Sequence, residues 1–149
     1  MYANILLPTD GSPGTVAAAE HAGTLARAFD ATVHVLSVAD TRNRFESPTG
    51  GLAPSIWLSG ERDRAANAIE EAVAALPEDI DIEEIQGEGL PRKEIVEYVE
   101  ANDVDIVVMG THGRTGIDHY LLGSVAERVV RTSPVPVVTV PFDEDEDES

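Results

Sequence analysis

The stretch DIVVMGTHGRTG, residues 105–116, decides the fold, and Gly123-Ser124 follows it a few residues later. After its first residue, the segment 105–109 is wholly apolar, as expected of a strand at the centre of a parallel sheet. The glycines that follow let backbone N–H groups turn toward an anion with no Cβ in the way. A helix that begins near Gly123-Ser124 adds unpaired N–H donors and a positive dipole end, and Ser124 adds a hydroxyl. The stretch predicts a phosphate cradle, although a tight strand-to-helix connection alone uses a similar turn.

Outward from this stretch, short apolar strands alternate with amphipathic helices, which indicates a parallel sheet with helices on both faces. The predicted strands are residues 3–8, 32–38, 80–85, 105–109 and 136–140. The predicted helices follow Pro13, cover 61–76, begin at Pro91 and begin near Gly123-Ser124. Right-handed crossovers restrict this order to an α/β fold, a doubly wound five-stranded parallel sheet. Ligands of such sheets bind beyond the carboxyl ends of the strands, where the strand order reverses.

Local patterns refine these elements. Ser12 is a predicted N-cap with Pro13 at the first helical position. Apolar and acidic residues alternate over 80–85, which suits a half-exposed edge strand that ends in a turn at 87–89. The stretch 39–60, which contains Trp57, is predicted to be irregular and is long for a loop of a compact domain.

Composition sets the broad class. The chain has 149 residues, which suits one domain, and no run is long enough to span a membrane or to act as a signal peptide, so we expect a cytoplasmic protein. The absence of cysteine excludes disulfides, thiolate catalysis and cysteine metal sites. The net charge is −18, with Lys93 as the single lysine. Such a field repels nucleic acid and anionic membranes. It is typical of a solvated surface that keeps a protein soluble, and an origin in a salt-loving organism is a narrower hypothesis.

The spacing Gly110-x2-Gly113-x9-Gly123-Ser124 resembles the ATP-binding signature of the universal stress protein family. The opening ILLPTDGS, residues 5–12, and the ending VVRTSPVPV, residues 129–137, are also similar to that family. The resemblance covers residues 2–140 and implies a Rossmann-like fold of the adenine nucleotide alpha hydrolase-like type, with strand order 3-2-1-4-5. We therefore expect a domain over 1–141 and a disordered acidic tail over 142–149.

The resemblance also implies nucleotide-contacting residues. They are Pro8, Thr9, Asp10, Val38, Met109, Gly110, Gly113, Arg114, Gly123, Ser124 and Val125. The Asp10 carboxylate suits ribose hydroxyls and would repel phosphate, but an aspartate at this place can also simply cap a turn. The resemblance assigns the backbone of Val38 to adenine and the residues 113 and 123–125 to the phosphates. Arg114 either offsets phosphate charge or is solvated.

Several alternatives stay open at this stage. The ligand is ATP, AMP or a cyclic dinucleotide, with or without Mg²⁺, and the family resemblance implies a homodimer joined through the strand 136–140. A slow ATPase or autophosphorylating enzyme, with Thr111 or Ser124 as acceptor, is a second hypothesis. An interaction protein that binds no nucleotide is a third. The chain lacks Gly-x4-Gly-Lys-Ser/Thr and a lysine near the glycine loop, which argues against fast hydrolysis. It also lacks a Gly-x-Gly-x-x-Gly after the first strand, which argues against a dinucleotide-binding dehydrogenase. No catalytic residue or metal ligand is predicted, and all four histidines (His21, His34, His112 and His119) are expected to be structural or exposed.

Overall fold

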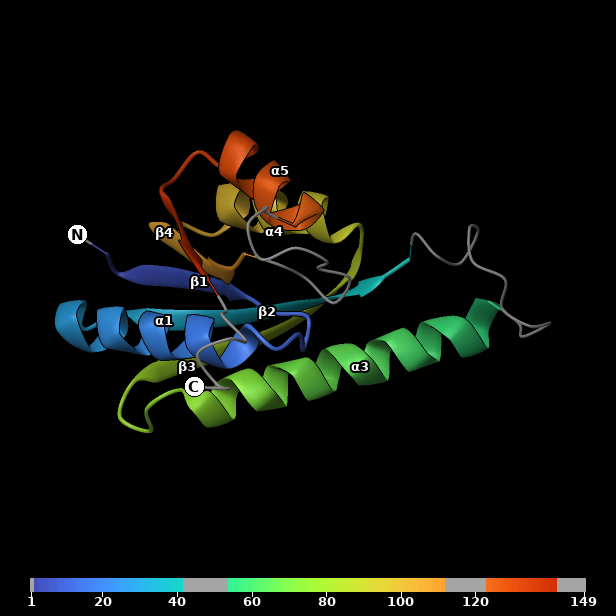
Figure 1. Cartoon of the computed structure of the whole chain (residues 1–149), viewed down its shortest axis with the longest axis horizontal. Helices are drawn as coiled ribbons and strands as arrows, with labels where there is room; N and C mark the ends of the chain where they lie inside the picture. Colours follow the sequence, from blue (N-terminus) through green and yellow to red (C-terminus); the bar gives the residue numbers. More distant parts are fainter. Residues whose placement is uncertain (1, 42–53, 112–122, 142–149) are drawn as a thin grey trace, which may run out of the picture.

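The computed structural model describes residues 2–41, 54–111 and 123–141. Strands and helices alternate along the chain (Figure 1). Their bounds are β1 Asn4–Pro8, α1 Thr15–Phe29, β2 Thr32–Asp40, α3 Pro54–Ala75, β3 Asp81–Gly89, α4 Pro91–Ala101, β4 Ile106–Gly110, α5 Ser124–Thr132 and β5 Val137–Val140. In the described part of the chain, no helix is both long enough and apolar enough to cross a membrane.

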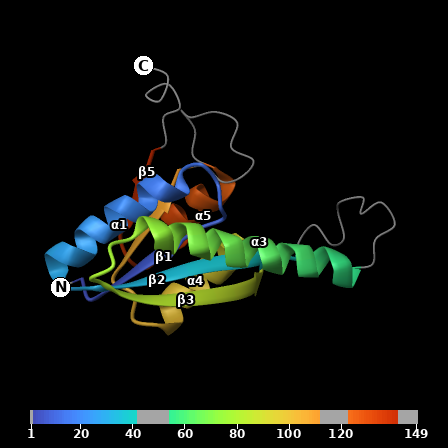
Figure 2. The same cartoon turned by 90° about the horizontal axis from the view of Figure 1, so that it is seen from below.

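The five strands form one parallel sheet in the order β3-β2-β1-β4-β5, which confirms the predicted topology. Helices α1 and α3 cover one face, and α4 and α5 cover the other (Figures 1 and 2). The strand order reverses between β1 and β4, which are neighbours as expected. The fold therefore places the predicted ligand edge at the carboxyl ends of these two strands.

Two apolar cores lie on the two faces of the sheet, and alternate residues of the central strands feed them. Ile5 and Leu7 pack with α1 and α3, whereas Leu6 packs with α4 and α5. All three side chains are fully buried. Because both faces of β1 are covered, the strand has a continuous apolar run without polar alternation.

Strand β3 lies at one edge of the sheet, and its alternating exposure confirms the predicted edge strand. The predicted turn at 87–89 is confined to Gly89, because β3 continues in register with β2 until Gly89 lies opposite Asp40. Gly89 has a φ of 140°, and the chain turns there into α4, which has Pro91 in its first turn. The sequence pattern missed the extension because the pairing partner of residues 86–89 lies almost 50 positions earlier in the chain.

Two further boundaries differ from the prediction. Ser12 is not the N-cap of α1, which begins at Thr15 after Gly14 with no capping side chain. The Ser12 N–H donates to Asp10 Oδ1 at 2.9 Å and its C=O accepts from Thr15 at 3.0 Å, so residues 11–14 form a turn of their own.

The irregular stretch predicted over 39–60 is also shorter, because β2 reaches Asp40 and α3 begins at Pro54. Trp57 therefore lies within a helix, and the acidic run after 142 lies outside the described residues.

Candidate functional site

Strands β1 and β4 pair only near their starts, at Ile5 with Ile106 and Leu6 with Val107. Beyond that point β4 continues to Gly110 in pairing with β5, whereas β1 continues in pairing with β2. The two strands therefore stop pairing toward their carboxyl ends. Pro8, Thr9 and Asp10 on one side and Met109 and Gly110 on the other flank this parting, as the sequence predicted for the strand ends.

The turn after β1 is ordered by its own polar groups. Thr9 N–H donates to the Leu36 carbonyl at 2.9 Å, and its hydroxyl shares a hydrogen bond of 2.9 Å with that of Thr15. Gly11 has a φ of 79°, which favours glycine, and a Cβ there would lie 3.6 Å from that of Ala68 in α3. The bond from Ser12 to Asp10 Oδ1 shows that Asp10 acts as a turn residue, while its predicted ribose contact stays a prediction.

The start of α5 lies directly beside the end of β4. Gly123 N–H donates to the Thr111 carbonyl at 2.6 Å, and the Gly123 carbonyl accepts from Glu127 at 2.9 Å as the N-cap of the helix. Ser124 is exposed, and Val125 is half-buried against the α4–α5 core. The first-turn N–H groups of a helix lack partners within it, so this terminus is suited to an anion. Gly113 and Arg114, which the sequence places in the same loop, lie outside the described residues, as do His112 and His119.

Strand β2 runs past the end of β1, and this changes the setting of Val38. The sequence predicts that Val38 ends the strand, but the residue lies two positions before the end of the strand at Asp40. The Leu36 carbonyl points toward β1, and alternate residues of a strand point the same way, so Val38 and Asp40 also face that side. The ladder with β1 stops at Pro8 and Leu36. The Val38 N–H and C=O therefore face the edge beyond β1, and no hydrogen bond within the described residues engages them.

A buried polar cluster that sequence reasoning missed lies at the same end of β2. Glu61 in α3 is only 3% exposed, and its Oε1 accepts from the Asp40 N–H at 3.0 Å. Arg64 forms an ion pair with the other oxygen of Glu61. A signal was present, because Glu61 falls in register with the apolar stripe of Ala65, Ala68 and Ala72 on the same helix.

A second set of contacts ties α3 to the end of β3. Gln86 Nε2 donates to the Arg62 carbonyl at 3.0 Å, and the Arg62 guanidinium pairs with Glu88. The hydrogen bond from Arg62 holds the pKa of Glu88 below its ordinary value, and the same bond raises the pKa of Arg62. Both side chains lie at the solvent, so the pair contributes little stability.

The described histidines do not lie at the carboxyl edge of the sheet. His34 is buried near the opposite end of the sheet, where Nδ1 shares a 2.7 Å hydrogen bond with the Tyr98 hydroxyl and Nε2 lies 3.0 Å from Asn4 Oδ1. Burial, together with the charge of Glu83, raises the pKa of Tyr98. His21 is exposed on α1. Within residues 2–41, 54–111 and 123–141, no three acidic or histidine side chains are placed to hold a metal ion.

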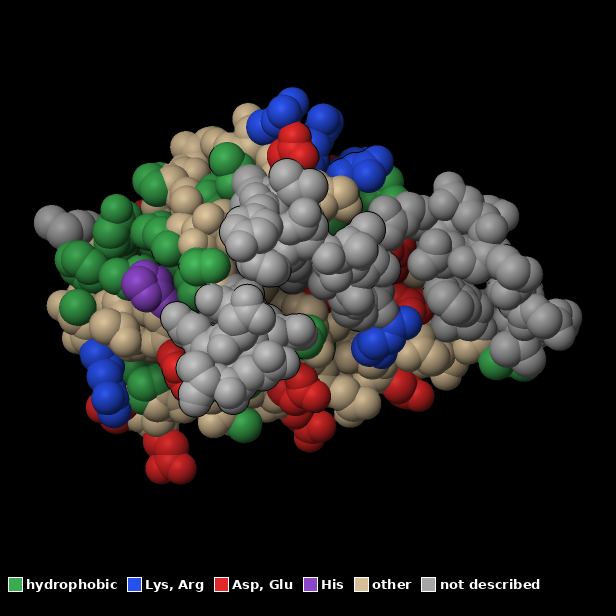
Figure 3. Space-filling model, viewed as in Figure 1, with side chains coloured by type: hydrophobic (Ala, Val, Ile, Leu, Met, Phe, Trp, Pro, Cys, Tyr) green, Lys and Arg blue, Asp and Glu red, His purple; other side chains and the backbone are tan. Residues whose placement is uncertain are grey.

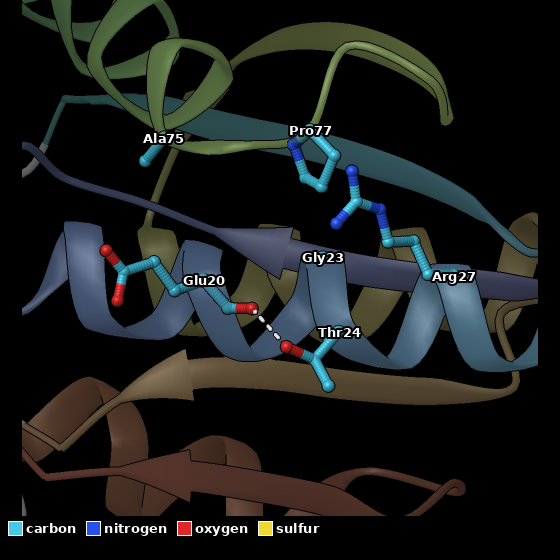
Figure 4. Close-up of a pocket in the computed structure, with 6 residues that line it drawn as sticks. All are labelled: Glu20, Gly23, Thr24, Arg27, Ala75 and Pro77. Carbon is cyan, nitrogen blue, oxygen red and sulfur yellow. Dashed lines mark hydrogen bonds between the residues drawn. The ribbon is translucent and has the colours of Figure 1, made fainter.

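A hollow of about 380 Å³ lies elsewhere, between the second half of α1 and the end of α3 (Figure 4). Its wall is formed by Glu20, Gly23, Thr24, Arg27, Ala75 and Pro77. The Thr24 hydroxyl donates to the Glu20 carbonyl, and Arg27 pairs with Asp79 at 3.0 Å. Because α1 runs back from the carboxyl end of β1, this hollow faces the amino ends of the strands and is separate from the candidate site.

Comparison with known proteins agrees with this geometry. The model of the universal stress protein family matches residues 1–141. Universal stress protein MJ0531 of Methanocaldococcus jannaschii is 39% identical over 147 residues, which cover 94% of this chain and 82% of that protein. The solved structure of MJ0577 from the same organism is 30% identical, with a TM-score of 0.75 over 97% of this chain and 99% of that one.

A third comparison concerns a ligand. A universal stress protein solved in complex with cAMP is 28% identical, with a TM-score of 0.62, and the match covers 94% of this chain and 97% of that one. The family match spans all the described elements of the sheet, and the glycine spacing lies within it. The chain therefore belongs to the universal stress protein family.

Proposed function

We propose that this protein is a regulatory module that binds an adenine nucleotide, ATP in the first instance, across the parting of β1 and β4. The observation that carries the proposal is the bond from Gly123 to the Thr111 carbonyl, which holds the start of α5 at the end of β4. N–H groups that have no partner within α5 thus lie beside the end of the central sheet, an arrangement that favours phosphate binding.

Each part of the nucleotide has candidate contacts. The phosphates would lie against the amides of Ser124 and Val125, with Gly113 and Arg114 contributing from the preceding loop. The ribose would meet Asp10, because hydroxyl groups donate to a carboxylate that would repel phosphate. Pro8, Thr9, Met109 and Gly110 would form the walls on the two sides of the parting.

The adenine would pair with the backbone of Val38. One residue of an overhanging strand offers an N–H donor and a C=O acceptor on the same side, and both face the edge beyond β1. Adenine presents a ring acceptor next to an amino donor, so the two edges are complementary. The cAMP complex of a related protein supports an adenine ligand. ATP would bring Mg²⁺ on its own phosphates; AMP and a cyclic dinucleotide use the same contacts in part.

The test is a substitution at Gly123, measured by titration calorimetry with ATP. Gly123 has φ −64° and ψ 158°, an ordinary conformation that leucine adopts without strain. Gly123→Leu should therefore fold normally but place a side chain in the phosphate space, weakening ATP binding by at least about thirtyfold. The control is Gly60→Leu in α3, because a Cβ at Gly60 meets nothing within 4 Å. Equal ATP affinity in the two variants would mean that the phosphates bind elsewhere.

We also propose that two copies associate through residues 136–140. Strand β5 lies at the open edge of the sheet, and all four of its residues are half-buried rather than exposed or covered. An edge strand with apolar side chains and unpaired N–H and C=O groups is a template for pairing with another chain. Sedimentation equilibrium would show a mass of two chains, and a mass of one chain would remove this part of the proposal.

The acidic composition suits a protein that works at high salt. With 28 acidic and 10 basic residues, the molecule repels itself at low ionic strength. We place the nucleotide-binding domain at residues 1–141 and treat the acidic tail 142–149 as a solvating segment.

A further inference from the structure

Val38 and Asp40 face the same edge beyond β1, yet within the described residues only Asp40 has a hydrogen-bond partner there. The Asp40 N–H donates to Glu61 Oε1 at 3.0 Å in a buried bond. Asp40 is 1% exposed and Glu61 is 3% exposed. Val38 is half-buried, and within the described residues its N–H and C=O have no partner on that edge. Glu61 thus accepts the hydrogen bond from the Asp40 N–H, which a backbone carbonyl of β1 would accept if β1 were longer.

Glu61 is held firmly in this role. Arg64, one turn further along α3, pairs with its second oxygen and so directs the first toward Asp40. The bond from Gln86 to the Arg62 carbonyl and the pair of Arg62 with Glu88 tie the same turn of the helix to β3. Figure 1 shows β2 extending beyond β1 alongside the first half of α3. The ends of β2 and β3 that extend beyond β1, here called the overhang, are therefore held in place by one turn of α3.

We propose that Glu61 is a positioning residue that makes the site selective for adenine over guanine. The inference rests on the nucleotide site proposed above. Glu61 fixes the overhang and occupies the Asp40 N–H, so a purine can pair only with Val38. In that position, adenine places its ring acceptor opposite the Val38 N–H and its amino group opposite the Val38 C=O. Guanine has a carbonyl where adenine has an amino group, so it would set two acceptors against each other unless it moved along the strand.

The experiment compares three ligands by titration calorimetry: ATP, GTP and inorganic tripolyphosphate. Wild-type protein should prefer ATP to GTP. Glu61→Ala removes the brace and exposes the Asp40 N–H, so ATP binding should weaken by about tenfold and the ATP-to-GTP preference should shrink by a similar factor. Tripolyphosphate binding should change by less than about twofold, because the phosphate contacts come from α5 on the other side of the parting.

Two further variants sharpen the result. Glu61→Gln keeps an oxygen that can accept from Asp40 but loses the ion pair with Arg64, so its ATP-to-GTP preference should lie between those of the wild type and Glu61→Ala. Glu70→Ala removes an exposed carboxylate from the same helix and should bind all three ligands as the wild type does. If Glu61→Ala weakens ATP and tripolyphosphate equally, or if it leaves the ATP-to-GTP ratio unchanged, Glu61 does not position the base.

Amide hydrogen exchange of the wild type provides a measurement that needs no variant. The Asp40 amide should be protected with and without ATP, whereas the Val38 amide should become protected only with ATP. Exchange of Asp40 as fast as an open loop would overturn the inference. A wild type that binds tripolyphosphate but shows no preference between ATP and GTP would overturn it as well, while leaving a phosphate site in place. A wild type that binds none of the three would overturn the proposed function and this inference with it.

Discussion

At the scale of single residues, Glu94 shows how packing against a tight turn can shift the pKa of a carboxyl group. Gly89 turns the chain with a φ of 140°, and a Cβ at that position would lie only 3.1 Å from Glu94 Cδ. The Glu94 side chain, which comes from the first turn of α4, therefore packs against the backbone at Gly89. Burial, followed by the hydrogen bond and charge of Glu97, raises the pKa of Glu94, and Lys93 opposes the shift.

Glu94→Gln should stabilise the protein at neutral pH. A carboxyl with a raised pKa in the folded state binds its proton more tightly there than in the unfolded chain, so its contribution is present below the unfolded pKa and is lost as pH rises through the folded pKa. The neutral glutamine avoids that loss, and the melting temperature should rise by about 1–2 °C at pH 7. Near pH 4 wild type and variant should melt alike, and an equal gain at both pH values would contradict the shift.

At the scale of elements, two helical glycines occupy opposite environments. Gly23 in α1 is buried where the helix approaches the end of α3, and a Cβ there would lie 2.6 Å from Pro77 Cδ. Gly60 in α3 is exposed, and nothing lies within 4 Å of the same atom. The first glycine allows the close approach of two elements, whereas the second only weakens its own helix.

The substitutions Gly60→Ala and Gly23→Ala should therefore act in opposite directions. Gly60→Ala should raise the free energy of unfolding by about 0.5–1 kcal/mol, because alanine costs less conformational entropy in a helix. Gly23→Ala should lower it by about 1–3 kcal/mol, because a buried overlap outweighs the same gain. Urea denaturation measures both. Stabilisation by the alanine at position 23 would show that α1 and Pro77 are not in close contact.

At the scale of the whole molecule, charge is the main feature. The net charge is −18, and seven of the ten cations lie in the described residues. On the face drawn in Figure 3, Lys and Arg side chains gather mainly over α5, and acidic side chains lie mostly over α1 and α3. Because the charges are mostly of one sign, their repulsion favours the unfolded chain, in which they are farther apart.

The melting temperature should therefore rise with KCl. The Debye length falls from about 10 Å at 0.1 M salt to about 3 Å at 1 M, so screening should raise the melting temperature by roughly 5 °C over this range. A variant with the exposed Glu20, Glu70 and Glu100 changed to Gln carries less charge and should show a smaller rise. A melting temperature that does not respond to KCl would remove the proposed adaptation to salt.

Much of the fold could be predicted because local patterns report it. The apolar runs 5–7 and 106–109 identified the central strands, and the alternation at 80–85 identified an edge. The glycine spacing that begins at Gly110 identified the family. The candidate site was predictable only at the strand ends and at the start of α5. Val38 was assigned to the right strand, but its position within that strand was wrong, and Glu61 was missed.

The sequence by itself determined the order and type of the elements and the doubly wound sheet, because these follow from periodicity and chirality, while its resemblance to the family implied the strand order. Only the tertiary structure decided how far β2 and β3 extend, where α1 begins, and that a glutamate of α3 lies buried against the Asp40 amide. The physical reason is that these features depend on hydrogen bonds between segments far apart in the chain. Every residue except proline has the same backbone N–H, so the sequence does not show which partner will accept from it.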